Sequence, residues 1–238
     1  MGQKIFRPRW WAVILVLVLG GTMVGLGIWQ IQRGFEKAEL LARYRAADSQ
    51  TPRELTAGGW AEAGVIERAL ARGHFDADRQ LLLDNQSHDH IPGYRVWTPL
   101  ILVHGGIVVV DRGWIPAGGD RSQLPALPVP QGEVTVKGYW RAPPEPGLRV
   151  QTDNCAGGPW PRIVQYPTVD DLRCIYGEST ASGILLMDAD LPGGFVRDWT
   201  GTPELSPNKH YAYAAQWFAF TLVLLVIFVK FSFRPRPT

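Results

Sequence analysis

Residues 10–32, WWAVILVLVLGGTMVGLGIWQIQ, decide the fold class of this chain, because the stretch contains no charged side chain. At a rise of about 1.5 Å per residue, an α-helix of this length crosses a hydrocarbon core of about 30 Å. Trp10, Trp11 and Trp29 bracket the stretch, and aromatic rings are enriched at both interfaces of a membrane. We therefore predict a transmembrane helix over residues 10–32.

A cleaved signal peptide is the alternative for the same stretch. Basic residues precede it, as they do at the start of a signal peptide: Lys4, Arg7 and Arg9. The apolar run exceeds the roughly 7–15 residues usual in a signal peptide, and no Ala-x-Ala cleavage sequence precedes Trp29. These two features favour a retained helix.

A second apolar run, YAYAAQWFAFTLVLLVIFV, occupies residues 211–229, between His210 and Lys230. A buried core helix is the alternative here. The basic residues beyond one end of the run favour a membrane span. We predict a second transmembrane helix over residues 207–229.

Glycines in the first span suggest how it meets another helix. Gly20, Gly21, Gly25 and Gly27 form a small-residue stripe of the kind that lets helix backbones approach closely in a membrane. The alternative is that glycine is simply tolerated in this span, as it is in many transmembrane helices.

Charge is distributed unevenly along the chain. The whole chain is 46% hydrophobic and 19% charged, with a net charge of +2, which excludes disordered and collagen-like proteins. All 22 acidic residues lie between residues 33 and 209. Six basic residues lie in the two acid-free ends: Lys4, Arg7, Arg9, Lys230, Arg234 and Arg236. The averages therefore combine a slightly acidic middle with two basic, apolar ends.

The basic ends predict the orientation, because Lys and Arg are retained on the cytoplasmic side of a membrane. We expect cytoplasmic tails over residues 1–9 and 230–238 and a periplasmic domain over residues 33–206. Arg33 and Lys37 also follow the first span, so basic residues flank this span on both sides of the membrane. No room for a mitochondrial transit peptide precedes the first span. We therefore predict a two-span protein of the bacterial inner membrane.

The middle of the chain changes from helical to β periodicity. Residues 30–47 continue the first helix, whereas residues 94–103 and 107–115 are apolar runs on either side of a His-Gly-Gly turn. This pattern predicts a β-hairpin covered on both faces. Further strands are predicted at residues 134–140, 162–166 and 184–188. The fold class is a membrane protein in which two transmembrane α-helices flank one exported, mainly β (α+β) domain.

The two cysteines of the chain are Cys155 and Cys174. An exported domain permits a disulfide between them, and a bridge over a loop of this length contributes about 3 kcal/mol in the chain-entropy model. Two free thiols are the alternative. A metal site is not expected from this pair, because zinc and copper ligands have shorter spacings.

No catalytic motif is evident, and we expect that the protein is not an enzyme. His88 and His90 would project to one side if their segment were a strand, with Asp84 nearby as a third metal ligand. A polar loop before the hairpin is the alternative reading. The sequence contains no nucleophile elbow, phosphate-binding loop or His-Glu-x-x-His pattern.

His210 lies at the predicted start of the second span. Ser206 is the expected N-cap and Pro207 the first helical residue, which puts His210 in the first turn at the outer membrane face. Tyr213 and Trp217 follow near the same side. A neutral imidazole in this position is able to ligate a haem iron. The alternative is an interfacial histidine hydrogen-bonded to water.

Short motifs occur in a fixed order from the first span to the second. Residues 25–33 read GLGIWQIQR with Lys37 beyond, residues 93–100 read GYRVWTPL, and residues 110–116 read VDRGWIP. Residues 138–141, 192–194 and 208–218 read GYWR, PGG and NKHYAYAAQWF. In this order they resemble the surfeit-locus family of cytochrome c oxidase assembly factors, over about residues 25–220. Residues 147–180 depart from the family pattern.

The resemblance implies a role in building haem-copper oxidase, by delivering or holding haem a while the haem-bearing core subunit matures. The family's haem-associated histidine corresponds to His210, with Tyr213, Trp217 and Trp29 beside it. Arg33 and Lys37 would then meet haem propionates, although contact with lipid headgroups is the alternative. The implied partners are the core subunit, other assembly factors and membrane lipid, with no nucleic acid.

A scaffold is the rival from another functional class. It would hold oxidase assembly intermediates together through the spans and the β domain, without binding haem. A third, weaker alternative is an exported metal-binding enzyme that uses His88 and His90.

Overall fold

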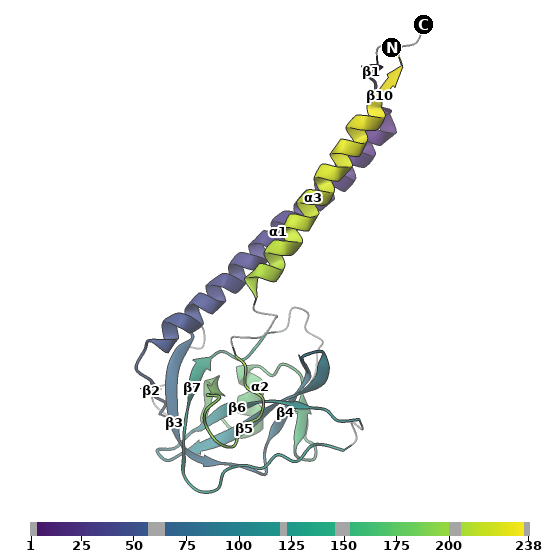
Figure 1. Ribbon diagram of the computed structural model, residues 1–238. Helices are drawn as coiled ribbons and strands as arrows, with labels where there is room; N and C mark the ends of the chain where they lie inside the picture. Colours follow the sequence, from purple (N-terminus) through teal and green to yellow (C-terminus); the bar gives the residue numbers. More distant parts are fainter. Residues whose placement is uncertain (1–3, 57–64, 120–122, 146–152, 200–205, 236–238) are drawn as a thin grey trace. The chain divides into compact units, whose positions relative to one another are not determined.

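The computed structural model describes residues 4–56, 65–119, 123–145, 153–199 and 206–235 (Figure 1). The chain divides into two compact units, Met1–Ala42 with Gly201–Thr238, and Arg43–Thr200. The first unit contains most of two long apolar helices, and the second is mainly β. The predicted fold class, two apolar terminal helices flanking a mainly β domain, is confirmed.

The two helices are α1, Trp10–Asp48, and α3, Pro207–Ser232. Both are long and apolar enough to cross a membrane. Helix α1 continues without a break past the apolar run, because residues 30–47 contain no Pro and only Gly34 interrupts a series of good helix formers. The predicted continuation of the first helix is therefore correct.

The helices run antiparallel. Two short strands join the start of α1 to the end of α3. Strand β1, Lys4–Phe6, pairs antiparallel with β10, Phe233–Pro235. The ring of Phe6 packs edge-on against Phe233, with 5.5 Å between ring centroids. Figure 1 shows β1 and β10 together at this end of the helix pair. The sequence does not predict this pairing, since each strand is only three residues long.

Glycines of α1 allow close contact with α3. A Cβ atom on Gly27 would lie 2.8 Å from Cζ of Phe218, and one on Gly34 would overlap the ring of Tyr211. A Cβ atom on Gly20 would lie 3.9 Å from Cδ2 of Leu224, which is an ordinary van der Waals distance. The spacing of seven residues places all three glycines on one side of the helix.

The predicted glycine stripe is therefore partly wrong. Gly20 and Gly27 do face α3, but a Cβ atom added to Gly21 or Gly25 would have no heavy atom within 4 Å, so these two point elsewhere. Gly34 replaces them as the third contact. A helix places residues on one side at intervals of three, four or seven, and Gly21 and Gly25 lie outside the series that begins at Gly20.

Five strands of the β unit pair in a closed ring: β3 (Glu67–Phe75), β7 (Val134–Arg141), β9 (Thr180–Met187), β6 (Ile107–Pro116) and β5 (Ile91–Leu102). Gly73 to Phe75 of β3 pair with Leu102 to Leu100 of β5, which closes the barrel. Strands β6 and β9 run parallel, and the other neighbours in the ring run antiparallel. Further elements extend it: β2 (Arg53–Glu54), β4 (Leu81–His88), β8 (Arg162–Val164) and α2 (Val169–Tyr176).

The predicted hairpin is confirmed as β5 and β6, both buried along most of their length. Strands β7, β8 and β9 overlap the other three predictions, although β8 ends at Val164 and β9 begins at Thr180. Strands β3 and β4 are additional to those predicted. The core positions of β3 include Ala69 and Ala71, which lack the β-branched side chains that mark a strand.

The barrel interior is filled by apolar side chains from every strand of the ring. Trp140 is its largest member and is fully buried. The cluster contains Leu55, Ala69, Ala71, Leu100, Leu102, Val108, Val110, Val136, Trp140, Ala181, Leu185 and Met187. Burial of this set from water supplies the main stabilisation of the unit.

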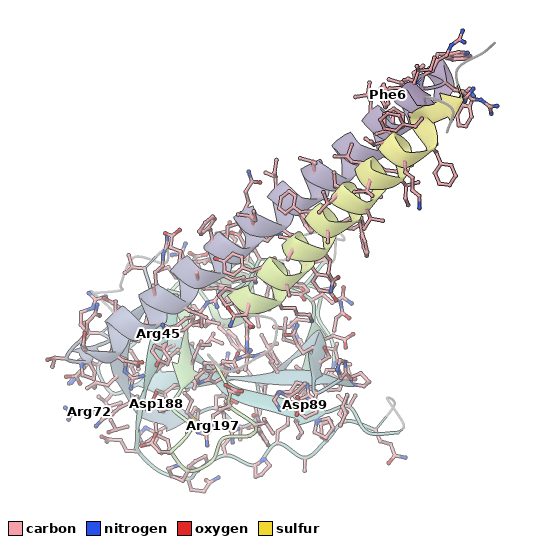
Figure 2. The ribbon with its side chains drawn as sticks, turned by 45° about the horizontal axis from the view of Figure 1, so that its top comes forward. Phe6, Arg45, Arg72, Asp89, Asp188 and Arg197 are labelled. Atoms are coloured by element: carbon pink, nitrogen blue, oxygen red, sulfur yellow. A yellow bond between two sulfur atoms is a disulfide. The ribbon has the colours of Figure 1, made fainter. Side chains whose placement is uncertain are left out.

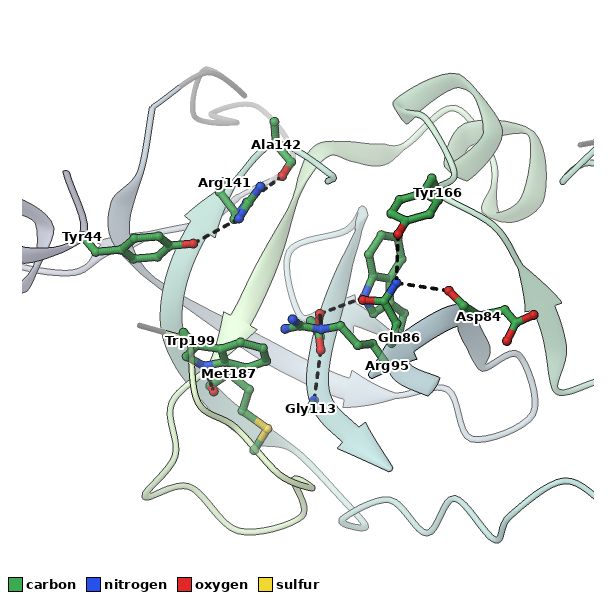
Figure 3. A network of polar contacts seen from close by, with 12 residues as sticks. Tyr44, Asp84, Gln86, Arg95, Gly113, Arg141, Ala142, Tyr166, Met187 and Trp199 are labelled. Atoms are coloured by element: carbon green, nitrogen blue, oxygen red, sulfur yellow. Dashed lines mark hydrogen bonds and ion pairs between the residues drawn. The ribbon is translucent and has the colours of Figure 1, made fainter. Parts of the chain in front are cut away.

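Asp111 of β6 is the centre of a buried polar network, with 1% of its surface exposed. Its carboxylate accepts hydrogen bonds from Nε of Arg95 at 2.8 Å, Nε1 of Trp97 at 2.9 Å and the amide of Gly113 at 3.0 Å (Figure 3). Burial raises the pKa of Asp111, while the nearby Arg95 opposes that rise. The guanidinium of Arg95 also lies 4.3 Å from the ring centroid of Trp199.

Arg112, the next residue, projects from the opposite face of β6, since side chains alternate along a strand. Its guanidinium donates to the carbonyl oxygens of Gly193 and Pro128 and to Oε1 of Gln80. Burial lowers the pKa of Arg112 to about 10, and Arg197 adds to the effect, so the group remains charged at neutral pH. Each face of β6 therefore contains one buried charge with internal partners.

The last turn of α1 belongs to the β unit and packs on β7. The hydroxyl of Tyr139 donates to the carboxylate of Asp48. Nη1 of Arg141 donates to the hydroxyl of Tyr44 at 3.1 Å (Figure 3). Burial, together with Asp48, raises the pKa of Tyr139 to about 12. Arg68 forms an ion pair with Asp188, which is labelled in Figure 2. The start of the domain is thus fixed to its sheet.

Replacing Gly27 by leucine is expected to separate α1 from α3, because the new side chain meets the ring of Phe218. Overpacking of this kind costs about 1–3 kcal/mol. The thermal unfolding midpoint of the full chain in detergent, followed by circular dichroism, should fall. Gly25→Leu is the matched control, since a Cβ atom there meets nothing within 4 Å. Equal midpoints for the two variants would contradict this helix contact.

Replacing Asp111 by asparagine is expected to destabilise the β unit by about 3–5 kcal/mol, because it removes the carboxylate charge that faces the guanidinium of Arg95. The midpoint of thermal unfolding measures the effect. Glu133→Gln, which makes the same chemical change at an exposed position before β7, is the control and should stay within about 0.5 kcal/mol of wild type. A stable Asp111→Asn variant would show that the network does not hold the barrel.

Candidate functional site

The candidate site is the start of α3, where His210 lies in the first helical turn. Helix α3 begins at Pro207, and Ser206 precedes it with an extended backbone, as the sequence predicts. Ser206 is the N-cap residue, as predicted, although its side chain makes no capping hydrogen bond. Proline fixes its own backbone for the first helical position, which suffices to start the helix here.

His210 is paired with Gln30 of α1, and both side chains are partly buried. Nδ1 of His210 and Oε1 of Gln30 lie 2.8 Å apart. In a neutral imidazole this contact selects the tautomer with the proton on Nδ1, because an amide oxygen only accepts hydrogen bonds. Nε2 is then unprotonated and has a lone pair available for a ligand.

Two glycine contacts flank this pair and bring the helices close enough for it to form. Gly27 meets Phe218 on one side, and Gly34 meets Tyr211 on the other. Tyr211 also packs edge-on against Phe35, with 6.0 Å between ring centroids. The position of the imidazole is therefore set by packing within the helix pair.

The predicted aromatic neighbours of His210 lie around the helices. Trp29 of α1 is 49% exposed and Tyr213 of α3 is 45% exposed. Trp217 is half-buried and packs edge-on against Phe220 of its own helix, with 6.1 Å between centroids. Two of the three rings therefore remain accessible to a ligand or to lipid.

The predicted cations follow on α1, one and two turns after Gln30. Nη1 of Arg33 lies 2.6 Å from a carboxylate oxygen of Glu36, on the exposed surface of the helix. Lys37 is half-buried. The structure thus brings His210 to Gln30, and it pairs Arg33 with Glu36 rather than with the histidine.

Cys155 and Cys174 form a disulfide in the structure, with their Cα atoms 5.9 Å apart. Cys174 belongs to α2, whose first turn is capped by Thr168 and Asp171. Asn154 donates to the carboxylate of Asp171 at 3.1 Å, so the loop before Cys155 is attached to the same helix. Part of the region that departs from the family pattern, residues 147–152, lies outside the described residues.

His88 and His90 do not form the metal site considered from the sequence. Strand β4 ends at His88, whereas His90 lies in the following turn with a φ of 65°. The premise that both project from one strand is therefore wrong. The ring of His88 lies 5.3 Å from that of Trp114, between centroids. Within the described ranges no group of three His, Cys, Asp or Glu side chains is placed to hold a metal ion.

Gln30, the partner of His210, is a site residue that the sequence-based prediction does not include. A signal for it exists, since Gln30 and Gln32 are polar amides in a mostly apolar stretch, where an unpaired amide is costly. Each span contains such a polar group near the same expected membrane face. The pairing itself depends on the glycine contacts, which periodicity alone does not reveal.

Comparison with known proteins places the chain in a family. A sequence profile described as the SURF1 family matches residues 17–222. A SURF1-like protein of Monosiga brevicollis is 25% identical over 236 residues, which cover 92% of this chain and 86% of that protein. A SURF1-like protein of Caenorhabditis briggsae is 24% identical over 241 residues, covering 91% of this chain and 74% of the relative.

A bacterial relative is similar to the same extent. An uncharacterized SURF1-like protein of Mycobacterium tuberculosis strain H37Rv is 24% identical over 233 residues, which cover 92% of this chain and 82% of the relative. The match of the profile spans both helices and the β unit between them. The chain therefore belongs to the SURF1 family, which is known generally as a family of cytochrome oxidase assembly factors.

Proposed function

We propose that this protein is a membrane-anchored assembly factor of haem-copper cytochrome c oxidase that binds haem a while the haem-bearing core subunit matures. Family membership supports the coarser role in oxidase assembly. The hydrogen bond between His210 and Gln30 is the observation that supports haem binding, because the tautomer that donates to Gln30 has its lone pair on Nε2. Nε2 of His210 would hold the iron that a bound haem would supply.

The residues of the candidate site are of the types that a haem group requires. A histidine that ligates a metal usually donates its other ring N–H to a carbonyl or carboxylate, which fixes the orientation of the ring. Oxygen Oε1 of Gln30 accepts that hydrogen bond here. The exposed rings of Trp29 and Tyr213, together with Trp217, offer apolar surface for the faces of a porphyrin.

Arg33 and Lys37 are the proposed partners of the haem propionates. Guanidinium and ammonium groups form strong, charge-assisted hydrogen bonds with carboxylates. Arg33 already holds the carboxylate of Glu36, at a side chain that is about half exposed. An exposed pair of this kind is worth less than about 1 kcal/mol, so a propionate is able to displace Glu36.

A scaffold that does not bind haem is the second candidate, and the same contact favours it. A hydrogen bond between polar side chains stabilises helix pairs in membranes by about 0.6–2 kcal/mol. His210 and Gln30 would then only hold α1 to α3. The scaffold would bring the core subunit and other assembly factors together through the helices and the β unit.

The proposed location is the bacterial inner membrane, with both chain ends in the cytoplasm and the β unit in the periplasm. Three observations support it: the antiparallel helices with their paired ends, the acid-free basic tails, and the disulfide, a bond that persists in oxidising compartments. The proposed partners are protein subunits, haem a and lipid, with no nucleic acid.

The haem proposal is tested by co-expressing the full chain with haem a synthesis and recording its absorption spectrum after purification in detergent. We expect a bound-haem spectrum for wild type and its loss in His210→Ala, because the axial nitrogen is removed. Gln30→Ala should weaken haem binding about 10–100-fold, as loss of an outer hydrogen-bond partner does at other metal sites.

His104→Ala, at an exposed histidine in the β5–β6 turn, is the matched control and should retain the spectrum. An unchanged spectrum in His210→Ala would refute the ligand role of this histidine. A wild-type protein without haem that still supports oxidase maturation would favour the scaffold.

The topology proposal is tested with alkaline phosphatase, a reporter that is active only in the periplasm. We expect an inactive fusion after Thr238 and an active insertion at Gly105, an exposed turn position with a φ of 85° where an added Cβ atom meets nothing within 4 Å. Fluorescent protein fusions at the same two sites should give the reverse pattern. Activity after Thr238 would overturn the orientation.

A further inference from the structure

A cavity lies between α1 and α3 at the end of the pair where β1 meets β10. Its volume is about 670 Å³, within the range of about 300–1,000 Å³ typical of small-molecule sites. Most of its lining is hydrocarbon, contributed by such residues as Leu15, Leu224 and Phe228. Phe6, labelled in Figure 2, marks this end of the helix pair.

Two guanidinium groups line the same cavity, from Arg9 before α1 and from Arg234 in β10. No acidic residue occurs in residues 1–32 or 210–238, so the segments that form the cavity offer these cations no acidic side chain. The first acidic residue along α1 is Glu36, about 40 Å from Arg9 along the helix axis. The cationic side chains of the cavity are therefore suited to an external anion.

The remaining polar group of the lining already has a partner. The hydroxyl of Ser232 donates to the carbonyl oxygen of Phe228 at 2.7 Å. The ring of Trp11 lies beside Arg9, with 5.9 Å from the guanidinium carbon to the ring centroid, as expected for an interfacial tryptophan. The cavity thus combines an apolar interior with a cationic rim.

We propose that this cavity binds one acidic phospholipid from the leaflet at which both chain ends lie. The phosphate contacts Arg9 and Arg234, and the acyl chains lie along the apolar lining. Arginine suits this role because its planar guanidinium binds phosphate oxygens through two parallel hydrogen bonds. A soluble anion would leave the hydrocarbon lining uncovered, and a zwitterionic lipid would place a second cation near the guanidinium groups.

The exposure of the cavity wall supports a ligand from the bilayer. Trp11, Leu15, Ile227 and Phe231 are exposed large apolar residues at this end of the pair. In a spanning helix pair, these side chains face lipid. An acyl chain is therefore the neighbour that they meet in the membrane.

The test measures lipid binding by the full chain, purified in detergent and stripped of endogenous lipid. Native mass spectrometry follows binding of dioleoylphosphatidylglycerol in competition with dioleoylphosphatidylcholine. Wild type should retain one phosphatidylglycerol per chain. The double variant Arg9→Gln/Arg234→Gln should lose about thirtyfold in apparent affinity, because each cation near a phosphate contributes about 1 kcal/mol.

Arg7→Gln/Lys230→Gln is the matched control, since it removes two exposed cations at the same end that do not line the cavity. It should change the affinity less than about threefold. Ala12→Phe narrows the cavity without changing charge and should also reduce binding. Equal losses in the two double variants, equal retention of both lipids, or displacement of phosphatidylglycerol by equimolar haem would each overturn the proposal.

Discussion

The close approach of α1 and α3 at Gly27 and Gly34 is the constraint on which the helix unit depends. In a bilayer, lipid tails are as apolar as the helix surface, so the hydrophobic effect does not bring the helices together. Packing at short range and polar contacts between helices must do so. The hydrogen bond from His210 to Gln30 lies between two of the glycine contacts, and it forms because they reduce the distance between the backbones.

The β unit is stabilised by a different arrangement. Asp111 and Arg112 are adjacent in β6, yet each is satisfied on its own face of the strand by separate partners. The positive φ of Gly113 allows its amide to reach the carboxylate of Asp111, and a Cβ atom there would meet the carbonyl oxygen of Val196 at 2.6 Å. The motif of residues 110–116 therefore encodes the buried polar groups on both faces of β6.

The motifs that identify the family are consequently of two kinds. Residues 93–100 and 110–116 form the buried polar centre, so their presence reports the fold. Residues 25–33 and 208–218 contain Gln30 and His210, so their presence indicates the candidate site at the start of α3. The spans, the hairpin and the later strands were predictable because their periodicity is strong. Strand β3 was not predictable, because Ala69 and Ala71 occupy its core positions and alanine favours a helix.

The two units differ in whether their charged and polar side chains have partners inside the protein. Among the described residues, the buried charges of the β unit discussed above each have internal partners, and burying them without such partners would cost several kcal/mol. On the helices, by contrast, the contact of His210 with Gln30 uses Nδ1 and not Nε2 at one end of the pair, and Arg9 and Arg234 have no acidic side chain nearby in sequence at the other. The two proposed ligands, a carboxylate-bearing tetrapyrrole and an acidic lipid, are both amphiphiles that partition into a bilayer. The chemistry of this protein is therefore expected where its helices meet the two faces of the membrane.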